Sequence, residues 1–333
     1  MLLTALLLIV GLVVLYYGAE FLVAGASKIA LSFGVSPMIV GLTVVAFATS
    51  APEFVVSLTA TLQGTSDIAV GNVVGSNIAN IALIVGVASA IFPMAVERSV
   101  FARDYPLMLL ISFGMMGLAV AGRQFTAVDG LLLLAVLVFF LGLCTREAVR
   151  QNREFRETGA WDVKKVERPN LGVQVGKVVL GIAGLVVGAR LMVDSAVEIA
   201  LSFGVSELVI GVSIIAIGTS LPELATSVVA ALKKEPDISL GNIIGSNIFN
   251  VGFIIGGVSL VSPIPVSAQA LAFDLPMVLL ISLLLFPLMR RENKVTRADG
   301  ILLLFVYVGY LVLTWALSTG LLTVPWLPSS SGA

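Results

Sequence analysis

Long apolar segments separated by short polar ones run along almost the whole chain of 333 residues. A helix crosses the roughly 30 Å hydrocarbon core of a bilayer with about 20 residues, and ten segments reach or approach that length. They span residues 3–24, 34–62, 68–92, 105–122, 127–145, 172–198, 205–232, 238–262, 272–289 and 299–318. The pattern predicts an all-α polytopic membrane protein with ten transmembrane helices.

The order of residues repeats after 170 positions without a gap. Residues 31–36 recur as 201–206, and the segment Gly-Asn-Val-Val-Gly-Ser-Asn at 71–77 recurs as Gly-Asn-Ile-Ile-Gly-Ser-Asn. Such self-similarity indicates one structural unit that is used twice. The predicted units are a first five-helix repeat, a polar cytoplasmic loop, a second five-helix repeat and a linker-like tail, over residues 1–145, 146–170, 171–328 and 329–333.

The distribution of basic residues predicts how the repeats sit in the membrane. An odd number of spans per unit makes the second unit enter the bilayer from the opposite side. Taking the loop at 146–170 as cytoplasmic places most of the 19 Lys and Arg residues on that side, as the positive-inside rule requires. We therefore predict two inverted five-helix repeats with both termini outside the cytoplasm.

Each repeat carries hydroxyls and a carboxylate around a proline, at residues 49–53 (Thr-Ser-Ala-Pro-Glu) and 219–223 (Thr-Ser-Leu-Pro-Glu). A proline inside a helix leaves the carbonyl four residues back without its usual donor. A carboxylate in hydrocarbon is costly, so a glutamate there indicates a functional site. An ordinary proline kink would explain a bent helix, but it leaves the duplicated glutamate unexplained.

The next span of each repeat adds a polar stripe to an apolar helix, at positions i, i+4 and i+8. These positions are Asn72, Ser76, Asn80, Asn242, Ser246 and Asn250. Asparagines can also serve as hydrogen-bonding glue between helices, and this interpretation is favoured for Asn77 and Asn247.

Two such units related by a pseudo-twofold axis would place Glu53 and Glu223 across one cavity lined by oxygen atoms. Hard cations such as Ca²⁺ and Na⁺ prefer oxygen ligands. The chain has no histidine, which removes a common ligand of transition metals. Competition between one Ca²⁺ and several Na⁺ ions for the same oxygens would be a physical basis for exchange.

The paired motifs T-S-x-P-E and G-N-x-x-G-S-N-x-x-N resemble the two α-repeats of the cation/Ca²⁺ exchanger superfamily, and are most similar to those of prokaryotic Na⁺/Ca²⁺ exchangers. They lie within residues 41–86 and 211–256. The resemblance implies a ten-helix antiporter of the prokaryotic plasma (inner) membrane that works by alternating access. Its transported ions would be Ca²⁺ and Na⁺, without an organic cofactor.

The resemblance also implies which residues hold the ions, the alanines through their carbonyl oxygens. They are Ala46, Thr49, Ser50, Glu53, Ser76, Asn80, Ala216, Thr219, Ser220, Glu223, Ser246 and Asn250. An amide at position 250, where potassium-dependent relatives carry an acid, favours a potassium-independent cycle. The G-N-A-x-E signature of the proton-coupled branch is missing, which favours Na⁺ as the coupling ion.

Other functions stay open or are disfavoured on chemical grounds. Exchange of H⁺ for Ca²⁺ or another divalent cation is the alternative within the same class, because a buried Glu can carry a proton. A passive cation channel is the alternative from another class. An enzyme is not expected, because there is no histidine and no spare pair of acids within the membrane.

A net charge of −1 argues against nucleic-acid binding, so the expected partners are cations and the lipid bilayer. The oligomeric state is open, and a monomer is expected to suffice for transport.

Two further expectations concern charged residues outside the motifs. Glu20 and Arg190 occupy equivalent positions of the two repeats and are predicted to form an ion pair. Asp104 and Asp274 each precede a proline by two positions and are predicted to cap helices.

Overall fold

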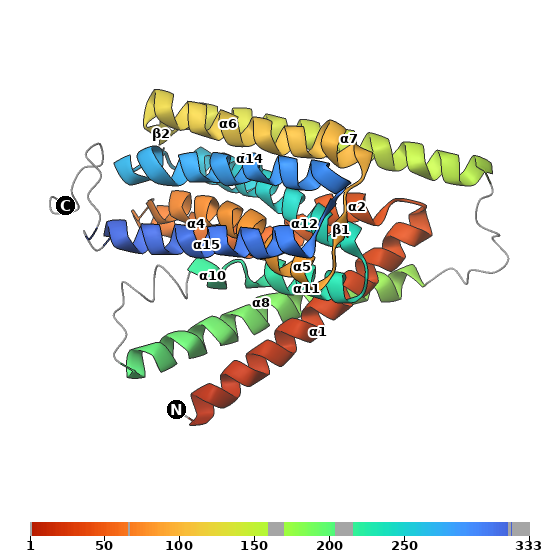
Figure 1. Ribbon diagram of the computed structural model, residues 1–333, viewed down its shortest axis with the longest axis horizontal. Coiled ribbons are helices and arrows are strands. Elements are labelled where there is room, and N and C mark those ends of the chain that lie inside the picture. Colours follow the sequence, from red (N-terminus) through yellow and green to blue (C-terminus); the bar gives the residue numbers. More distant parts are fainter. Residues whose placement is uncertain (1, 66, 159–169, 204–215, 319–320, 322–333) are drawn as a thin grey trace.

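The computed structural model describes residues 2–65, 67–158, 170–203, 216–318 and 321, and these are almost entirely helical (Figure 1). Short π-helical turns, labelled η, interrupt several of the helices. The first half of the chain forms α1 (Leu2–Phe33), α2 (Pro37–Val40), η1 (Gly41–Val45), α3 (Ala46–Leu62), α4 (Asp67–Ile78), η2 (Ala79–Ile84), α5 (Val85–Ile91), β1 (Met94–Ala95), η3 (Val100–Asp104), α6 (Tyr105–Gly122), β2 (Gln124–Phe125) and α7 (Ala127–Thr158).

The second half follows the same order. It forms α8 (Leu171–Ser202), α10 (Ala216–Gly218), α11 (Leu221–Leu232), α12 (Pro236–Phe249), η5 (Asn250–Ile255), α13 (Gly256–Val261), β3 (Ile264–Pro265), η6 (Ala270–Asp274), α14 (Leu275–Glu292), β4 (Lys294–Val295) and α15 (Arg297–Ser318).

Nine helices within the described ranges are long and apolar enough to cross a membrane, which confirms a polytopic helical membrane protein. They correspond to nine of the ten predicted segments. The remaining segment, 205–232, lies partly outside the described residues, and its later part forms α10 and the apolar helix α11.

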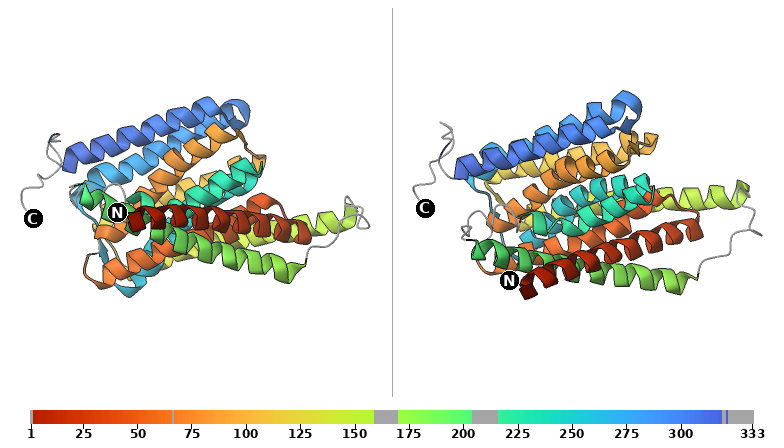
Figure 2. Two further views of the ribbon diagram at one scale, coloured as in Figure 1. Left: turned by 90° about the horizontal axis from the view of Figure 1, so that it is seen from below. Right: turned by 60° about the horizontal axis from the view of Figure 1, so that its bottom comes forward.

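Two helices form the centre of the bundle. The most apolar windows of the spans Ile68–Ile91 and Pro236–Val261 are 72% and 83% buried, whereas those of α1, α7 and α8 are 28% buried. α1 and α8 lie side by side and cross obliquely along one side of the bundle, as both views in Figure 2 show. The polar stripes predicted from the sequence therefore lie on the innermost helices.

Two short strand pairs connect the halves of the chain. β1 pairs antiparallel with β4, Met94 opposite Val295, and β2 pairs antiparallel with β3, Phe125 opposite Ile264. Adding 170 to the number of a residue in β1 or β2 gives a residue in β3 or β4, so the two pairings are equivalent to each other. The repeat seen in the sequence is therefore also present in the contacts.

Helix α7 is longer than expected, because residues 146–158, predicted as part of a loop, continue it to Thr158. Ion pairs one turn apart support this extension, with N–O distances of 2.7 Å for both Arg150–Glu147 and Arg153–Glu157. Pairs at this spacing stabilise a helix that has no apolar partner. These residues were predicted to form a loop because many of them are charged, but an exposed helix also accommodates many charged side chains.

The predicted pair between Glu20 and Arg190 is wrong. The Glu20 carboxylate lies 3.0 Å from Lys233 Nζ at the end of α11, and Arg190 instead pairs with Asp194 one turn further along α8, at 3.7 Å. Equivalent positions in two repeats do not imply contact, because each side chain takes the opposite charge that its own surroundings offer.

The predicted helix caps are also wrong. Asp104 and Asp274 have helical backbone angles and make no capping hydrogen bond, because the π-helical turns η3 and η6 run directly into α6 and α14. The backbone N–H groups there are already inside a helix. Asp104 accepts a hydrogen bond from Arg103 at 2.6 Å, and Asp274 accepts one from Tyr310 at 3.4 Å.

Glycines allow α1 and α8 to touch backbone to backbone. A Cβ atom on Gly181 would lie 2.6 Å from the Leu22 nitrogen and 2.8 Å from the Gly18 oxygen. Close approach of this kind is how small residues hold helices together in a membrane, where the hydrophobic effect contributes little to helix association.

Substituting Gly181→Ala is expected to push α1 and α8 apart, because backbone atoms cannot move aside as a side chain can. We expect a loss of about 1–3 kcal/mol, typical of overpacking. Thermal unfolding of the purified protein in detergent measures this as a lower melting temperature. Gly176→Ala on the same helix is the control, since a Cβ there meets nothing within 4 Å. Equal melting temperatures of the two variants would contradict the assignment.

Candidate cation site

The two motif glutamates lie together at the centre of the bundle. Glu53 comes from α3 and Glu223 from the first turn of α11, and both are almost completely buried. The two carboxyl groups are close enough to interact electrostatically, and Glu223 also lies beside Thr49 and Ser50. The structure thus brings together two acids that are 170 residues apart.

Neither carboxylate has a hydrogen-bond partner within the described part of the chain. Both oxygens of Glu53 and both of Glu223 are buried and unpartnered, and so is the Ser50 hydroxyl. Leaving a buried polar group unpaired is costly, and leaving two like charges facing each other is more so. A cation bound between the two groups would remove both penalties.

Hydroxyl groups from both repeats meet around the carboxylates. Ser220 donates to Ser76 across 3.1 Å, and Thr49 Oγ1 lies 3.4 Å from Ser246 Oγ. Each contact joins a residue of one repeat to a residue of the other. Four predicted site residues therefore form one cluster with the two acids.

The two amides predicted for the site lie at π-helical turns. Asn80 belongs to η2, and neither its oxygen nor its nitrogen has a partner among the described residues. Asn250 begins η5, donates to Asn77 Oδ1 across 3.0 Å, and keeps its own oxygen unpartnered. A π-helical turn widens the helix locally and is frequent at functional sites. The bond to Asn250 agrees with the glue role expected of Asn77, whereas Asn247 donates to Ile243 in its own helix.

The remaining predicted residues lie on the same backbone segments. Ala46 begins α3, and its carbonyl oxygen lies 3.3 Å from Thr49 Oγ1. Ala216 begins α10, and Thr219 follows that helix at the turn before α11. Thr219 donates to Asn72 across 3.1 Å.

The two proline motifs have different backbones despite their similar sequences. Pro52 lies inside the continuous helix α3, whereas Pro222 lies in the first turn of α11, after a break at Thr219 and Ser220. The expected bent helix is therefore a continuous helix in one repeat and an interrupted one in the other. As a result Glu223 lies near the positive end of a helix dipole, which favours a negative charge there.

Two serines that the sequence analysis missed bond to the first asparagine of each predicted polar stripe. Asn72 donates to Ser57 across 3.0 Å, and Asn242 donates to Ser227 across 3.2 Å. Each serine follows a motif glutamate by four positions, and this duplicated spacing is a signal that could have identified them.

The donor set is made of oxygen and contains few charges. Within the described ranges no group of three or more His, Cys, Asp or Glu side chains is placed to hold a metal ion. Among the described residues, the groups named around the two carboxylates are neutral hydroxyls, amides and carbonyls. Such a set suits hard cations like Ca²⁺ and Na⁺ and offers nothing to soft metals.

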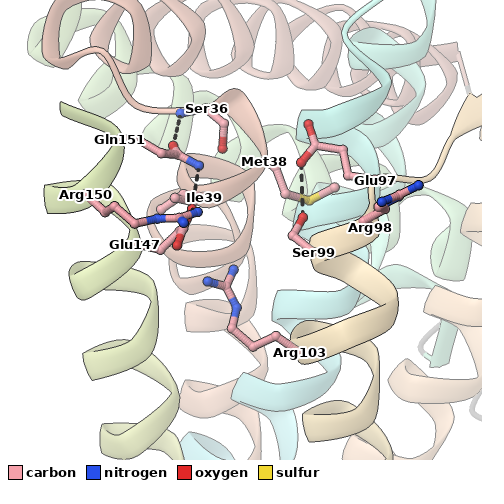
Figure 3. A pocket seen from close by; sticks show the side chains of 10 residues that line it. All are labelled: Ser36, Met38, Ile39, Glu97, Arg98, Ser99, Arg103, Glu147, Arg150 and Gln151. Atoms are coloured by element: carbon pink, nitrogen blue, oxygen red, sulfur yellow. Dashed lines mark hydrogen bonds and ion pairs between the residues drawn. The ribbon is translucent and has the colours of Figure 1, made fainter. Parts of the chain in front are cut away.

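A separate cavity of about 370 Å³ lies between the start of α2 and the polar end of α7 (Figure 3). It is lined by both acidic and basic side chains, and Gln151 there accepts a hydrogen bond from the Ser36 backbone N–H at 2.9 Å. Two of the three arginines that line it pair with acids, Arg150 with Glu147 and Arg103 with Asp104. None of the predicted ion ligands lines this cavity.

The buried oxygen cluster within a bundle of membrane-spanning helices is typical of membrane transporters for small cations. Comparison with known proteins identifies the group within that class. The model of the family described as sodium/calcium exchanger protein matches residues 3–146 and 173–316. The chain therefore belongs to the sodium/calcium exchanger family.

Individual relatives agree with this assignment. The chain is 39% identical to the inner membrane protein YrbG of Escherichia coli, over 96% of this chain and 98% of the relative. It is 34% identical to the sodium/calcium exchanger MaX1 of Methanosarcina acetivorans, over 92% and 97%. A solved structure of the sodium-calcium exchanger NCX_Mj, soaked with Na⁺ and Ca²⁺, superposes with a TM-score of 0.80 at 31% identity, covering 94% of this chain and 98% of that one.

Substituting Glu53→Gln or Glu223→Gln is expected to weaken Ca²⁺ binding by about 100-fold or more, since removing one partner of a buried charge interaction costs about 3–5 kcal/mol. The same change should raise the melting temperature in cation-free buffer, because it removes the repulsion between the carboxylates. Calorimetric titration and thermal unfolding with and without Ca²⁺ measure the two effects.

Glu198→Gln on α8 is the control, since that carboxylate binds Thr4 at 2.8 Å, outside the cluster. A wild-type affinity for Ca²⁺ in either motif variant would show that the cluster is not the binding site.

Proposed function

We propose that this protein is a Na⁺-driven Ca²⁺ antiporter whose ions bind at the cluster around Glu53 and Glu223. The observation that supports this most directly is a set of buried oxygen atoms that have no hydrogen-bond partner among the described residues, on both carboxylates, Ser50, Asn80 and Asn250. The two carboxylates balance one Ca²⁺ in charge, and the same oxygens are numerous enough to hold Na⁺ ions in its place. The proposed ligands are the twelve residues that the family resemblance implies.

Transport would proceed by alternating access around this fixed site near the middle of the membrane. We propose ten transmembrane helices in two inverted repeats, the tenth comprising α10, α11 and the residues before them. The equivalence of the two strand pairings, and of the hydrogen bonds from Thr49 to Asn242 and from Thr219 to Asn72, supports a two-fold arrangement. Inverted repeats provide two related conformations, each open to one side of the membrane.

Sodium is the proposed coupling ion. Neutral amides and hydroxyls around only two acids offer Na⁺ the ligands it prefers, and several such groups stand without partners. Family members named for Na⁺ and Ca²⁺ exchange are similar over nearly the whole chain. The proposed location is the prokaryotic plasma (inner) membrane with both termini outside the cytoplasm, and a single chain contains the complete site.

An imposed Na⁺ gradient is expected to drive Ca²⁺ against its own gradient in proteoliposomes that contain the purified protein. Uptake of radioactive Ca²⁺ into Na⁺-loaded vesicles measures it. Vesicles containing Glu223→Gln protein, prepared at the same protein-to-lipid ratio, are the control and are expected to show background uptake.

The same assay separates the alternatives. A pH gradient that replaces the Na⁺ gradient at full rate would contradict sodium coupling and identify H⁺/Ca²⁺ exchange. Ca²⁺ flux that continues without any counter-ion, at channel-like rates, would overturn antiport altogether.

A further inference from the structure

The amides of Asn72 and Asn242 each bridge the two repeats beside the carboxylate cluster. Asn242 Nδ2 donates to Ser227 Oγ across 3.2 Å. Its Oδ1, at 3.1 Å, is the nearest acceptor for the Thr49 hydroxyl, ahead of the Val45 and Ala46 carbonyl oxygens at 3.2 and 3.3 Å. Serine and asparagine belong to the second repeat, and the threonine to the first. The three side chains thus form a chain of hydrogen bonds that ends at a predicted ion ligand.

The equivalent chain exists at the equivalent positions. Asn72 Nδ2 donates to Ser57 Oγ across 3.0 Å and approaches the Glu53 carbonyl oxygen at 3.3 Å, while Asn72 Oδ1 accepts from Thr219 Oγ1 across 3.1 Å. Every member differs by 170 from its counterpart. The same chain of hydrogen bonds occurs twice at equivalent positions, which indicates that both copies have the same role.

The chemistry of a hydroxyl ligand explains what the amides would do. A threonine oxygen can turn its lone pairs to a cation only while its hydrogen points elsewhere. The oxygen of the asparagine amide accepts that hydrogen. In Asn72 the amide nitrogen also faces the Glu53 carbonyl oxygen, which can only accept, so the amide oxygen is left to face the threonine. In Asn242 the nitrogen donates to the serine and the oxygen faces the threonine in the same way. A flipped amide would place a donor against the threonine and turn the hydroxyl hydrogen away from the amide.

We propose that Asn72 and Asn242 are positioning residues that hold Thr219 and Thr49 in the orientation in which they bind the transported cation. The inference rests on the proposed function, since it takes the two threonines as ion ligands. Residues that orient metal ligands without touching the metal commonly change affinity by about 10–100-fold when they are replaced.

The two chains differ in burial, and this difference predicts their relative importance. Asn242, Ser227 and Thr49 are all completely buried, whereas Asn72 and Thr219 are only half-buried. Water can replace a lost partner more easily at a half-buried position. The loss of affinity is therefore expected to be larger for a substitution at Asn242 than at Asn72.

A double-mutant cycle between Asn242→Leu and Thr49→Val tests the proposal in the purified full-length protein, with the Kd for Ca²⁺ as the readout. Asn242→Leu is expected to raise the Kd about 10–100-fold in the wild-type background. In the Thr49→Val background it is expected to change the Kd less than about 2-fold, because the hydroxyl that it orients is already gone. A merely structural role would give the same loss in both backgrounds.

Asn247→Leu is the matched control. That residue is a buried amide on the same helix, bonded to the Ile243 carbonyl, and it is expected to lower stability without coupling to Thr49→Val. Should Asn242→Leu fail to fold, Ser227→Ala replaces it, because it removes only the anchor of the amide. It should produce a smaller rise in Kd that again disappears in the Thr49→Val background.

The outcomes separate this inference from the proposed function. The positioning role would be overturned if the rises in Kd of the two single variants multiplied in the double variant. It would also be overturned if Asn247→Leu coupled to Thr49→Val as strongly as Asn242→Leu does. Either result would leave the ion site in place. A wild-type protein that binds Ca²⁺ but shows no Na⁺-driven uptake would refute antiport alone. Absence of Ca²⁺ binding in the wild type would overturn both proposals.

Discussion

The constraint on which this structure depends is the presence of two carboxylates that face each other in the low-dielectric centre of a helix bundle. Their mutual repulsion and their loss of hydration are too large for the surrounding neutral groups to offset. Among the described residues no hydroxyl or amide forms a hydrogen bond to the carboxylates, and on the proposed function a bound cation takes that role. On that proposal, the site is stabilised when a cation is bound and destabilised by the repulsion between the carboxylates when it is not. This energetic difference also makes ion binding able to influence the packing of the helices around it.

The sequence alone was sufficient to predict much of this arrangement. The 170-residue repeat implied that Glu53 and Glu223 would meet, and the i, i+4, i+8 stripe implied that Ser76 and Ser246 would face the same space. The first result follows from the symmetry that relates two copies of one unit, and the second follows from the geometry of a helix. The assignment to the sodium/calcium exchanger family confirms the resemblance on which the choice of ions rests.

Other features could not be read from the sequence, because tertiary packing decides them. The π-helical turns η2 and η5 carry Asn80 and Asn250, yet nothing in either local sequence requires a widened turn. Near-identical proline motifs form a continuous helix in one repeat and an interrupted one in the other. Glu20 bonds to Lys233 because the end of α11 lies beside α1, a proximity that no local pattern encodes.

The two strand pairs have a consequence for how such a molecule can move. β1–β4 and β2–β3 each join a connection in one repeat to a connection in the other by backbone hydrogen bonds. Sliding one repeat as a block against the other would break both sets of hydrogen bonds at once. The two strand pairs therefore hold the helices that they connect in a fixed arrangement. Within the described residues, no such strand pair involves α1 or α8, and the two helices contact each other through glycines. Side chains rather than paired strands join α1 to the rest of the bundle, as in the hydrogen bonds of Ser27 with Glu235 and of Glu20 with Lys233.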